Sequence, residues 1–228
     1  MPFRLFAFDY DETVATEGRI QRSTEAALAA AREAGWRLAL VTGRPHEELV
    51  GICPQMPLFD LVVDENGGLV HLPATGSVEE LVARPNGGFR AGLTSRSVPF
   101  VAGRIVTITR RSHEKDVFDI IAEQGLDLDV FCNRFAVMVV PRGTSKASGL
   151  REGLRRVGVA PEDVIAAGDD ENDLAFFEVA GLRVAVANAI ANVKANADIV
   201  LSKPNGEGLA EFIRERLIGA PESLPRPR

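Results

Sequence analysis

The stretch FRLFAFDYDETVA, residues 3–15, decides the fold because its apolar run ends abruptly in acidic residues. Its first part, FRLFAF (3–8), is short, apolar and bounded, which is typical of a strand buried on both faces of a sheet. Asp9, Asp11 and Glu12 follow directly. Burying carboxylates is costly unless they are paired or bind a metal ion, so other parts of the sequence must supply their partners.

The composition is that of an ordinary globular protein, with 46% apolar and 25% charged residues in a chain of 228. This length is enough for one large domain or two small ones. The net charge of −6 and the dispersed basic residues argue against a nucleic-acid partner. The N-terminal sequence lacks the features of a signal peptide, and no apolar run is long enough to span a membrane. We therefore expect a cytoplasmic protein without membrane contact.

Two cysteines, Cys53 and Cys132, cannot form a disulfide framework, and neither has a metal-binding companion at close spacing. We expect both to be small buried apolar residues. They therefore carry no part of the functional prediction.

Strand-like and helix-like segments alternate along most of the chain, which indicates a parallel sheet covered by helices on both faces. The first predicted helix, 24–34, has Ser23 as its candidate N-cap and Gly35 as its stop. The fold class is therefore α/β, with a Rossmann-like core. The other predicted strands are 37–42, 61–68 with its Asn-Gly-Gly turn, 164–168, 183–188 and 199–202, and the other helices are 145–158, 172–181 and one around 208–217.

The segment 71–141 breaks this alternation and is predicted to form a small α+β module inserted into the larger domain. After a Pro- and Gly-rich passage it offers a strand at 104–109 and a helix over about 112–124. A further strand, FAVMVV (135–140), could be amphipathic or fully buried. The predicted division is a core domain of 1–70 and 142–220, the inserted module of 71–141, and a flexible tail of 221–228.

Polar and charged groups stand where three predicted strands end and where one helix begins. In an open parallel sheet, ligands bind at the carboxyl ends of the strands, and the N–H groups at a helix start favour an anion. The four groups together indicate one site. They are Asp9 with Asp11, Thr42 with Gly43 and Arg44, the run GDDEND at 168–173, and Lys146.

This set of groups suits phosphoryl transfer through an aspartyl intermediate. The reaction needs a carboxylate nucleophile, a proton donor, a hydroxyl, an ammonium group and further carboxylates for a cation. Mg²⁺ prefers a few carboxylates together with water and phosphate oxygens. The cation would let two negative groups, aspartate and phosphate, approach each other, which offsets the cost of placing acids after the first strand.

The motifs DYDET (9–13), VTGR (41–44), Lys146 and GDDEND (168–173) resemble the four motifs of the haloacid dehalogenase superfamily of phosphatases. The resemblance covers essentially the whole chain. An insertion between the second and third motifs resembles the Cof-like branch, which carries an α/β cap at that position. The short cap and the DENGG stretch (64–68) are similar to archaeal-type phosphoglycolate phosphatases and related sugar-phosphate phosphatases.

The resemblance implies a role for each motif residue. Asp9 would be the nucleophile and a magnesium ligand. Asp11 would protonate the leaving alcohol and then activate water, while its backbone carbonyl helps to hold the metal. Asp169 would bind Mg²⁺ directly, with Asp173 as a ligand or support. The residues expected to bind the substrate or its phosphate are Thr42, Gly43, Arg44, Asn66, Lys146 and Asn172.

Three further positions leave alternatives open. Glu12 stands where the family usually has glycine; glutamate would be strained there if the position needs a positive φ, and would otherwise face solvent or adjust the charge at the rim. Asn66 and Gly67 could contact substrate or simply form a tight turn. We expect most arginines of the cap to be surface residues, Arg134 among them.

The leading functional prediction is a Mg²⁺-dependent phosphatase acting on a small phosphorylated metabolite such as phosphoglycolate or a sugar phosphate, as a monomer or homodimer. One alternative is a phosphomutase, which would need a bisphosphate activator. A second is a phospho-acceptor switch like a bacterial receiver domain, against which the inserted module and the late GDDEND run argue. A third is a catalytically weak regulatory domain, towards which only Glu12 points.

Overall fold

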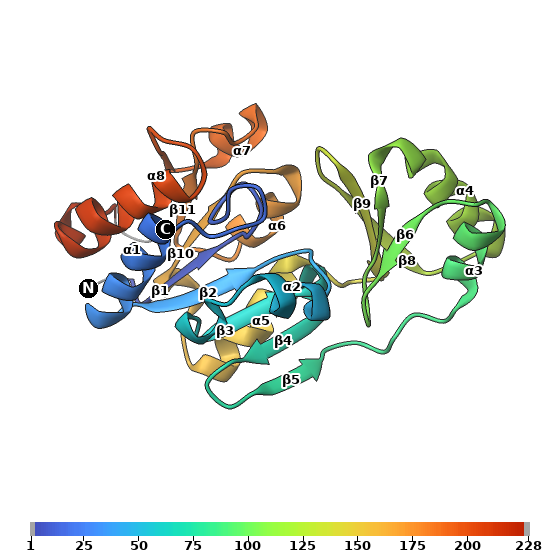
Figure 1. The fold of residues 1–228 in the computed structure, drawn as a ribbon, viewed down its shortest axis with the longest axis horizontal. Helices are drawn as coiled ribbons and strands as arrows, with labels where there is room; N and C mark the ends of the chain where they lie inside the picture. The colour runs from blue at the N-terminus through green and yellow to red at the C-terminus, as the bar shows by residue number, and fades with distance from the viewer. Residues whose placement is uncertain (1–2, 226–228) are drawn as a thin grey trace.

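The computed structural model describes residues 3–225 and contains two β-sheets, a large one and a small one (Figure 1). The large sheet has eight strands in the order β12-β11-β10-β1-β2-β3-β4-β5. The pairs from β12 to β3 are parallel, and β4 and β5 are added antiparallel at one edge. Its strands are β1 (Leu5–Phe8), β2 (Arg37–Val41), β3 (Leu61–Asp64), β4 (Leu69–Leu72), β5 (Ser77–Glu80), β10 (Val164–Gly168), β11 (Leu182–Ala185) and β12 (Ile199–Val200).

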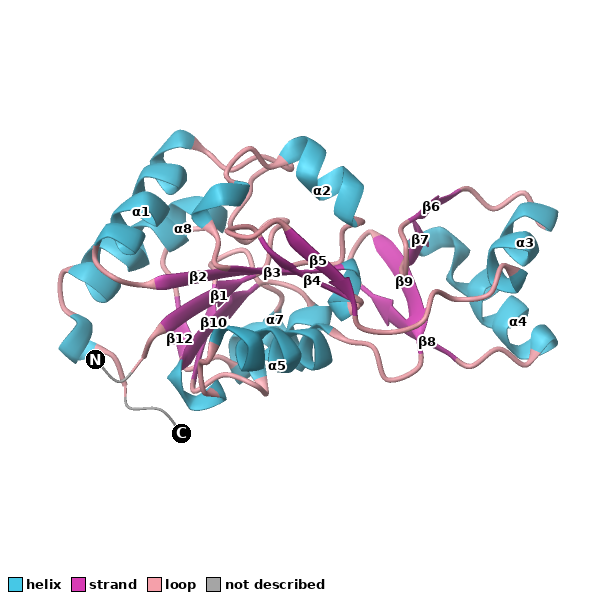
Figure 2. Cartoon of the chain, turned by 90° about the horizontal axis from the view of Figure 1, so that it is seen from below, coloured by secondary structure: helices cyan, strands magenta, loops and turns pink. Residues whose placement is uncertain are grey.

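Helices cover both faces of the large sheet. Figure 2 shows α1 and α8 on one side and α5 on the other. A short π-helix, Ile213–Ile218, continues α8. The α/β prediction is therefore confirmed, with a mixed rather than wholly parallel sheet. The helices around this sheet are α1 (Arg22–Glu33), α2 (His46–Ile52), α5 (Lys146–Val157), α6 (Leu174–Phe177), α7 (Ala191–Asn196) and α8 (Asn205–Phe212).

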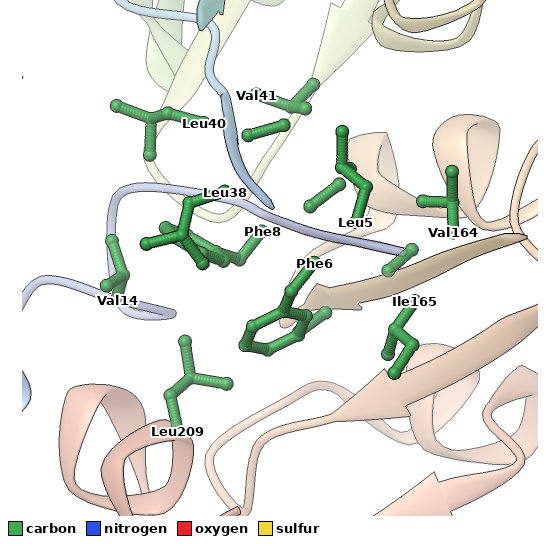
Figure 3. Packing of buried hydrophobic residues seen from close by; sticks show 14 of the residues in the cluster. Leu5, Phe6, Phe8, Val14, Leu38, Leu40, Val41, Val164, Ile165 and Leu209 are labelled. Carbon is green, nitrogen blue, oxygen red and sulfur yellow. The ribbon is translucent and has the colours of Figure 1, made fainter. Parts of the chain in front are cut away.

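The main hydrophobic core lies between the central strands and these helices (Figure 3). Every residue of β1 and β10 is buried, as expected for strands sandwiched between two helix layers. Phe6 and Phe8 lie edge to face, with 5.1 Å between their ring centroids. The apolar run that opens the sequence therefore forms the middle of the core, and the residues that follow it emerge at the carboxyl end of the sheet.

The small sheet has four antiparallel strands in the order β6-β7-β9-β8. Residues Val137 and Val139 face the two helices that cover one side, whereas Met138 and Val140 belong to a second cluster on the other side. The strand that the sequence leaves undecided is therefore buried on both faces over these four residues. The elements are β6 (Phe100–Ala102), β7 (Thr107–Arg110), β8 (Leu128–Cys132), β9 (Ala136–Pro141), α3 (Gly88–Ser95) and α4 (Glu114–Gln124).

The structure differs from the predictions at several boundaries. The boundary predicted at residue 71 falls inside β4, and the chain leaves the large sheet only after Glu80. The backbone cap of α1 is Gln21 rather than Ser23, and its side chain makes no capping bond. Within the predicted tail of 221–228, a 3₁₀ turn forms at 221–223 and Leu224 is buried in the core; residues 226–228 lie outside the described residues.

Two smaller predictions concern the cysteines and the membrane. Cys53 is buried and Cys132 is half-buried, and both are free thiols. Between residues 3 and 225, no helix combines the length and the apolar character that a membrane crossing requires.

Candidate active site

The polar motifs meet at the carboxyl ends of β1, β10 and β2. Phe8 pairs with Ala167 on one side and with Leu40 on the other, so the residues that follow these strands emerge side by side. A pocket of about 390 Å³ lies at this edge. Residues that follow the strands of the large sheet line its floor, and residues of the small sheet and its loops line its roof. The pocket therefore lies between the two sheets.

A buried lysine joins two of the carboxylates under this pocket. Lys146 Nζ donates to Asp9 Oδ1 at 2.5 Å and to Asp173 Oδ1 at 2.7 Å, and only 1% of the lysine is exposed. One carboxylate oxygen from each of Asp9, Asp169 and Asp173 lies within 4.8 Å of the others. Three carboxylates at this spacing form a donor set of the kind that a hard divalent cation prefers.

The start of α5 holds Lys146 in place. Ser145 is its N-cap, and its hydroxyl accepts from the Ser148 backbone N–H at 3.1 Å. The Ser148 hydroxyl accepts in return from the Ser145 N–H at 2.8 Å, which completes a capping box. Lys146 is the first helical residue, so the cap that fixes the helix start also fixes the lysine.

The turn after β10 is organised by Asp173. Its Oδ2 accepts from the backbone N–H groups of Asp169 at 2.8 Å and Asp170 at 3.0 Å. A Cβ at Gly168 would lie 2.6 Å from the Asp173 side chain, so only glycine allows this approach. Thr13 adds a contact that the sequence analysis did not assign, because its hydroxyl donates to Asp169 Oδ1 at 2.9 Å. Its place in DYDET is the only sequence signal for that role.

Burial and charge together set the ionisation of this cluster. Burial raises the pKa of Asp9 well above its usual value, although Lys146 acts in the opposite direction. Burial also raises the pKa of Asp169, to about 7. Burial alone would lower the pKa of Lys146, but Asp173 and Asp9 outweigh it and raise that pKa. Lys146 therefore stays protonated, whereas burial disfavours the ionised forms of Asp9 and Asp169.

Asp11 also lines the pocket, where it is paired with Arg44. The guanidinium donates through Nε to Asp11 Oδ2 and through Nη2 to Asp11 Oδ1, both at 2.7 Å. Arg44 also pairs with Glu48 and lies over the ring of Tyr10, 5.6 Å from its centroid. The carboxylate of Asp11 therefore has a cationic partner of its own and is not one of the three grouped acids. Its predicted contact with a metal uses the backbone carbonyl and stays a prediction.

Most of the other predicted site residues also line the pocket. Thr42, Gly43 and Asn172 do so, and Met138 of the small sheet lies so close to Gly43 that a Cβ there would be 2.4 Å from its sulfur. Asn66 is different, since it is buried beside the pocket rather than in its lining, and its side-chain oxygen and nitrogen have no hydrogen-bond partner among the described residues. Asn66 takes part in a tight turn, with a φ of +56°, and its contact with substrate stays a prediction.

Arg134 is exposed, as expected of most cap arginines, yet it also contacts the site. It follows β8, and its Nε donates to Asp170 Oδ2 at 2.9 Å while its Nη2 pairs with Asp169. Its backbone N–H donates to the same Asp170 oxygen at 3.2 Å. Nothing in the local sequence separates this arginine from its neighbours, because the contact depends on how the two sheets face each other.

Glu12 adopts the strained alternative, with a φ of +57°. This is the left-handed region that glycine occupies without cost. Asn188 Nδ2 donates to the Glu12 backbone oxygen at 2.7 Å, and Asn205 Nδ2 donates to its Oε2 at 3.2 Å. These bonds to two asparagines hold glutamate in a conformation that it would otherwise avoid.

Residues 6–80 and 101–213 match the sequence model of the haloacid dehalogenase-like hydrolases. The chain belongs to this family and is a phosphoric monoester hydrolase of that type. It is 34% identical over 218 residues to a phosphoglycolate phosphatase of Methanothermobacter thermautotrophicus, covering 92% of this chain and 97% of that one. It is 30% identical to phosphoglycolate phosphatase 2 of Saccharolobus solfataricus, covering 94% and 93%.

Solved structures share the fold at lower identity. A haloacid dehalogenase-like hydrolase from Bacteroides thetaiotaomicron has a TM-score of 0.80 at 22% identity, covering 93% of this chain and 99% of that one. A subclass IIB sugar phosphatase of the same superfamily has a TM-score of 0.76 at 23% identity, covering 93% and 98%. These likenesses show that both sheets have counterparts in that superfamily's fold.

Proposed function

We propose that this chain is a Mg²⁺-dependent phosphatase that cleaves the phosphomonoester of a small metabolite through an aspartyl-phosphate on Asp9. The observation that carries the proposal is the contact of Lys146 Nζ with Asp9 and Asp173 beside a third carboxylate, Asp169. Three carboxylates buried at one point are costly unless cations compensate their charge. The resemblance of all four motifs to those of the superfamily supports the same assignment.

The residues present fit a magnesium ion. Asp9, Asp169 and Asp173 bring carboxylate oxygens within 4.8 Å of one another. Burial raises the pKa values of Asp9 and Asp169, and the negative charge of Asp173 raises them further, so a cation at this point would be stabilised. Bound there, Mg²⁺ would neutralise charge on the phosphate and on the acids. The chain's own groups would do the remaining work.

In the first step, an Asp9 carboxylate oxygen attacks phosphorus while the bond from phosphorus to the ester oxygen breaks. Lys146 and Thr42 bind the phosphoryl oxygens, and Asp11 gives a proton to the departing alkoxide. Asp11 is held by Arg44 in the structure, so this proton transfer requires that it exchange that ion pair for the leaving-group oxygen. The products are an alcohol and phospho-Asp9.

In the second step, water attacks the phosphorus of phospho-Asp9. Asp11, now ionised, accepts a proton from that water, and the bond from phosphorus to the Asp9 oxygen breaks. Inorganic phosphate leaves and both carboxyl groups return to their starting forms. The same residue therefore acts as acid and then as base.

Phosphoglycolate is the substrate that we propose to test first. The curated relatives named for that activity cover nearly the full length of this chain, including the small sheet. Apolar side chains of the small sheet and Arg134 line the roof of the pocket. Arg134 would attract a second acidic group if it exchanged its contact with Asp169 or Asp170 for that group. Sugar phosphates are the next class to test. We place the activity in the cytoplasm, in a monomer or homodimer that needs no nucleic acid.

The test is phosphate release from phosphoglycolate, sugar phosphates and nucleotides, with Mg²⁺ and with a chelator. We expect Asp9→Asn to abolish turnover, a loss of at least about 10³-fold, because no other group can form the acyl phosphate. With p-nitrophenyl phosphate, whose leaving group needs little help from an acid, Asp11→Asn should let phospho-Asp9 accumulate, which mass spectrometry of the Asp9 peptide detects. Asp127→Asn is the matched control, since Asp127 is exposed and pairs with Arg142 away from the pocket.

An Asp9→Asn protein with unchanged turnover would end the assignment. Phosphate release that depends on an added sugar bisphosphate would favour the phosphomutase instead. A stable phospho-Asp9 in the unaltered protein, with no release of phosphate, would favour the phospho-acceptor.

A further inference from the structure

The DENGG stretch that follows β3 has no part in the chemistry above. Glu65 and Asn66 both have positive φ angles, +51° and +56°. A non-glycine residue is strained in this left-handed region because its Cβ lies too close to the following carbonyl oxygen. Two in succession require strong local contacts, and the side chain of Glu65 provides them.

The Glu65 carboxylate is fully buried and accepts four backbone hydrogen bonds. Its Oε1 accepts from the N–H of His46 at 3.2 Å and of Arg104 at 3.0 Å. Its Oε2 accepts from the N–H of Ile105 at 2.6 Å and of Val106 at 3.0 Å. Three of these donors belong to the segment between β6 and β7, so a core residue binds the backbone of the small sheet.

Two glycines make this approach possible. A Cβ at Gly103 would lie 2.5 Å from the Glu65 carboxylate, and a Cβ at Gly68 would lie 2.7 Å from the Ile105 side chain. Arg90 of α3 donates to the carbonyl oxygens of Gly103 at 2.8 Å and Val106 at 3.1 Å. The bound segment is thereby tied to the helical layer of the small sheet as well as to Glu65.

The same stretch contacts the phosphate-binding elements from the other side. The backbone N–H of Glu65 donates to the Arg44 carbonyl, and that of Asn66 donates to the Thr42 carbonyl, both at 3.0 Å. Gly67 packs directly against the Ser145 carbonyl, next to Lys146. The loop after β2, the start of α5 and the small sheet therefore meet at these few residues.

We propose that Glu65 is a positioning residue that fixes the cap, residues 81–141, over the phosphate-binding loop. The chain crosses between the two sheets twice, before α3 and after β9, and Glu65 adds a third, non-covalent attachment. Cap residues such as Met138 and Phe135 line the part of the pocket where the leaving group would lie. Glu65 therefore sets the fit of the leaving group, an effect on activity that rests on the proposed phosphatase function.

The first measurement is hydrogen exchange, which needs no activity. In Glu65→Gln, one acceptor oxygen becomes an amide donor. We therefore expect either the amide of Arg104 or those of Ile105 and Val106 to exchange at least about tenfold faster, depending on which oxygen is replaced. Glu47→Gln is the matched control, because exposed Glu47 accepts from the Arg104 side chain at 2.8 Å without touching those amides. Unchanged exchange in Glu65→Gln, or the same acceleration in Glu47→Gln, overturns the proposal.

The second measurement separates positioning from loss of stability. We expect Glu65→Gln to change the ratio of kcat/KM for phosphoglycolate to that for p-nitrophenyl phosphate by about tenfold, mainly through KM, because only the leaving group differs. A uniform loss on both substrates would contradict a positioning role. If the unaltered protein releases no phosphate but the exchange result holds, the proposed function fails and the anchoring role stands.

A second pair of variants guards against a Glu65→Gln protein that does not fold. Gly103→Ala places a methyl group against the Glu65 carboxylate while leaving Glu65 intact, so it should accelerate the same amides. Gly87→Ala has open space around its Cβ and should leave them protected. Equal exchange at residues 104–106 in both glycine variants overturns the proposal.

Discussion

At the scale of single residues, Asp169 would couple the proposed Mg²⁺ binding to pH. Burial raises its pKa to about 7, so below that pH the carboxyl group holds a proton that a metal ligand must lose. We expect the apparent affinity for Mg²⁺ to weaken by up to about tenfold per pH unit below 7 and to level off above it. Calorimetric titration of Mg²⁺ between pH 5.5 and 8.5 measures this, and an affinity independent of pH would contradict it.

Glu12 offers a test of backbone strain. Glu12→Ala and Glu12→Gly lose the same side-chain bonds, but only glycine relieves the φ of +57°. We expect the glycine variant to be more stable than the alanine variant by about 1 kcal/mol. Urea denaturation of the two proteins gives the difference, and an alanine variant of equal stability would show that the position carries no strain.

Some residues of the site can be predicted from the local sequence pattern, and others cannot. Asp9 and Lys146 were predicted to meet because each stands at a strand end or helix start, and the structure brings them into contact. The side chains of Glu65 and Arg134 gave no such signal. Their partners are a backbone segment about forty positions away and the turn after β10, which only the packing of the two sheets brings near.

At the scale of elements, the packing of α5 rests on small residues. A Cβ at Gly149 would lie 2.5 Å from the Gly67 Cα, whereas one at Gly51 in α2 would meet nothing within 4 Å. We expect Gly149→Ala to destabilise the protein by about 1–3 kcal/mol, because α5 must move away from the turn. Gly51→Ala should instead stabilise it by about 0.5–1 kcal/mol, since alanine favours helix. Thermal denaturation measures both, and equal effects would contradict the packing argument.

The elements that sequence predicts well here are those whose burial is complete. β1 and β10 are apolar throughout, so their patterns identify them without knowledge of their neighbours. α3 was missed because its sequence contains two glycines, and β5 because its side chains are mostly exposed. Such segments form because they pack against the rest of the fold. Local propensity gives no information about that packing.

At the scale of the whole molecule, the two sheets face each other across the pocket and touch at acidic residues of the core. Glu65 binds the turn between β6 and β7, and Asp170 binds Arg134 after β8. The first contact is fully buried, whereas 37% of the Arg134 side chain is exposed. The second contact is therefore the more easily broken of the two.

Arg134→Ala tests that second contact. Arg134 lines the pocket, and a partly exposed ion pair adds little to stability. We therefore expect kcat/KM to fall about fivefold, a loss of about 1 kcal/mol of transition-state binding, while stability changes little. Steady-state kinetics measure this, with Arg142→Ala as control because Arg142 pairs with exposed Asp127. A fall of equal size in the control variant would remove the link to the pocket.

The glycine at position 103 has a consequence for engineering. A chimera that joins the cap of another protein to this core domain would need more than matching junctions in the sequence. The transplanted piece would have to present three consecutive amides to Glu65 with no side chain in front of them. A transplanted cap that lacks a side chain at this position should take up the native orientation. Any other cap would be tilted relative to Asp9.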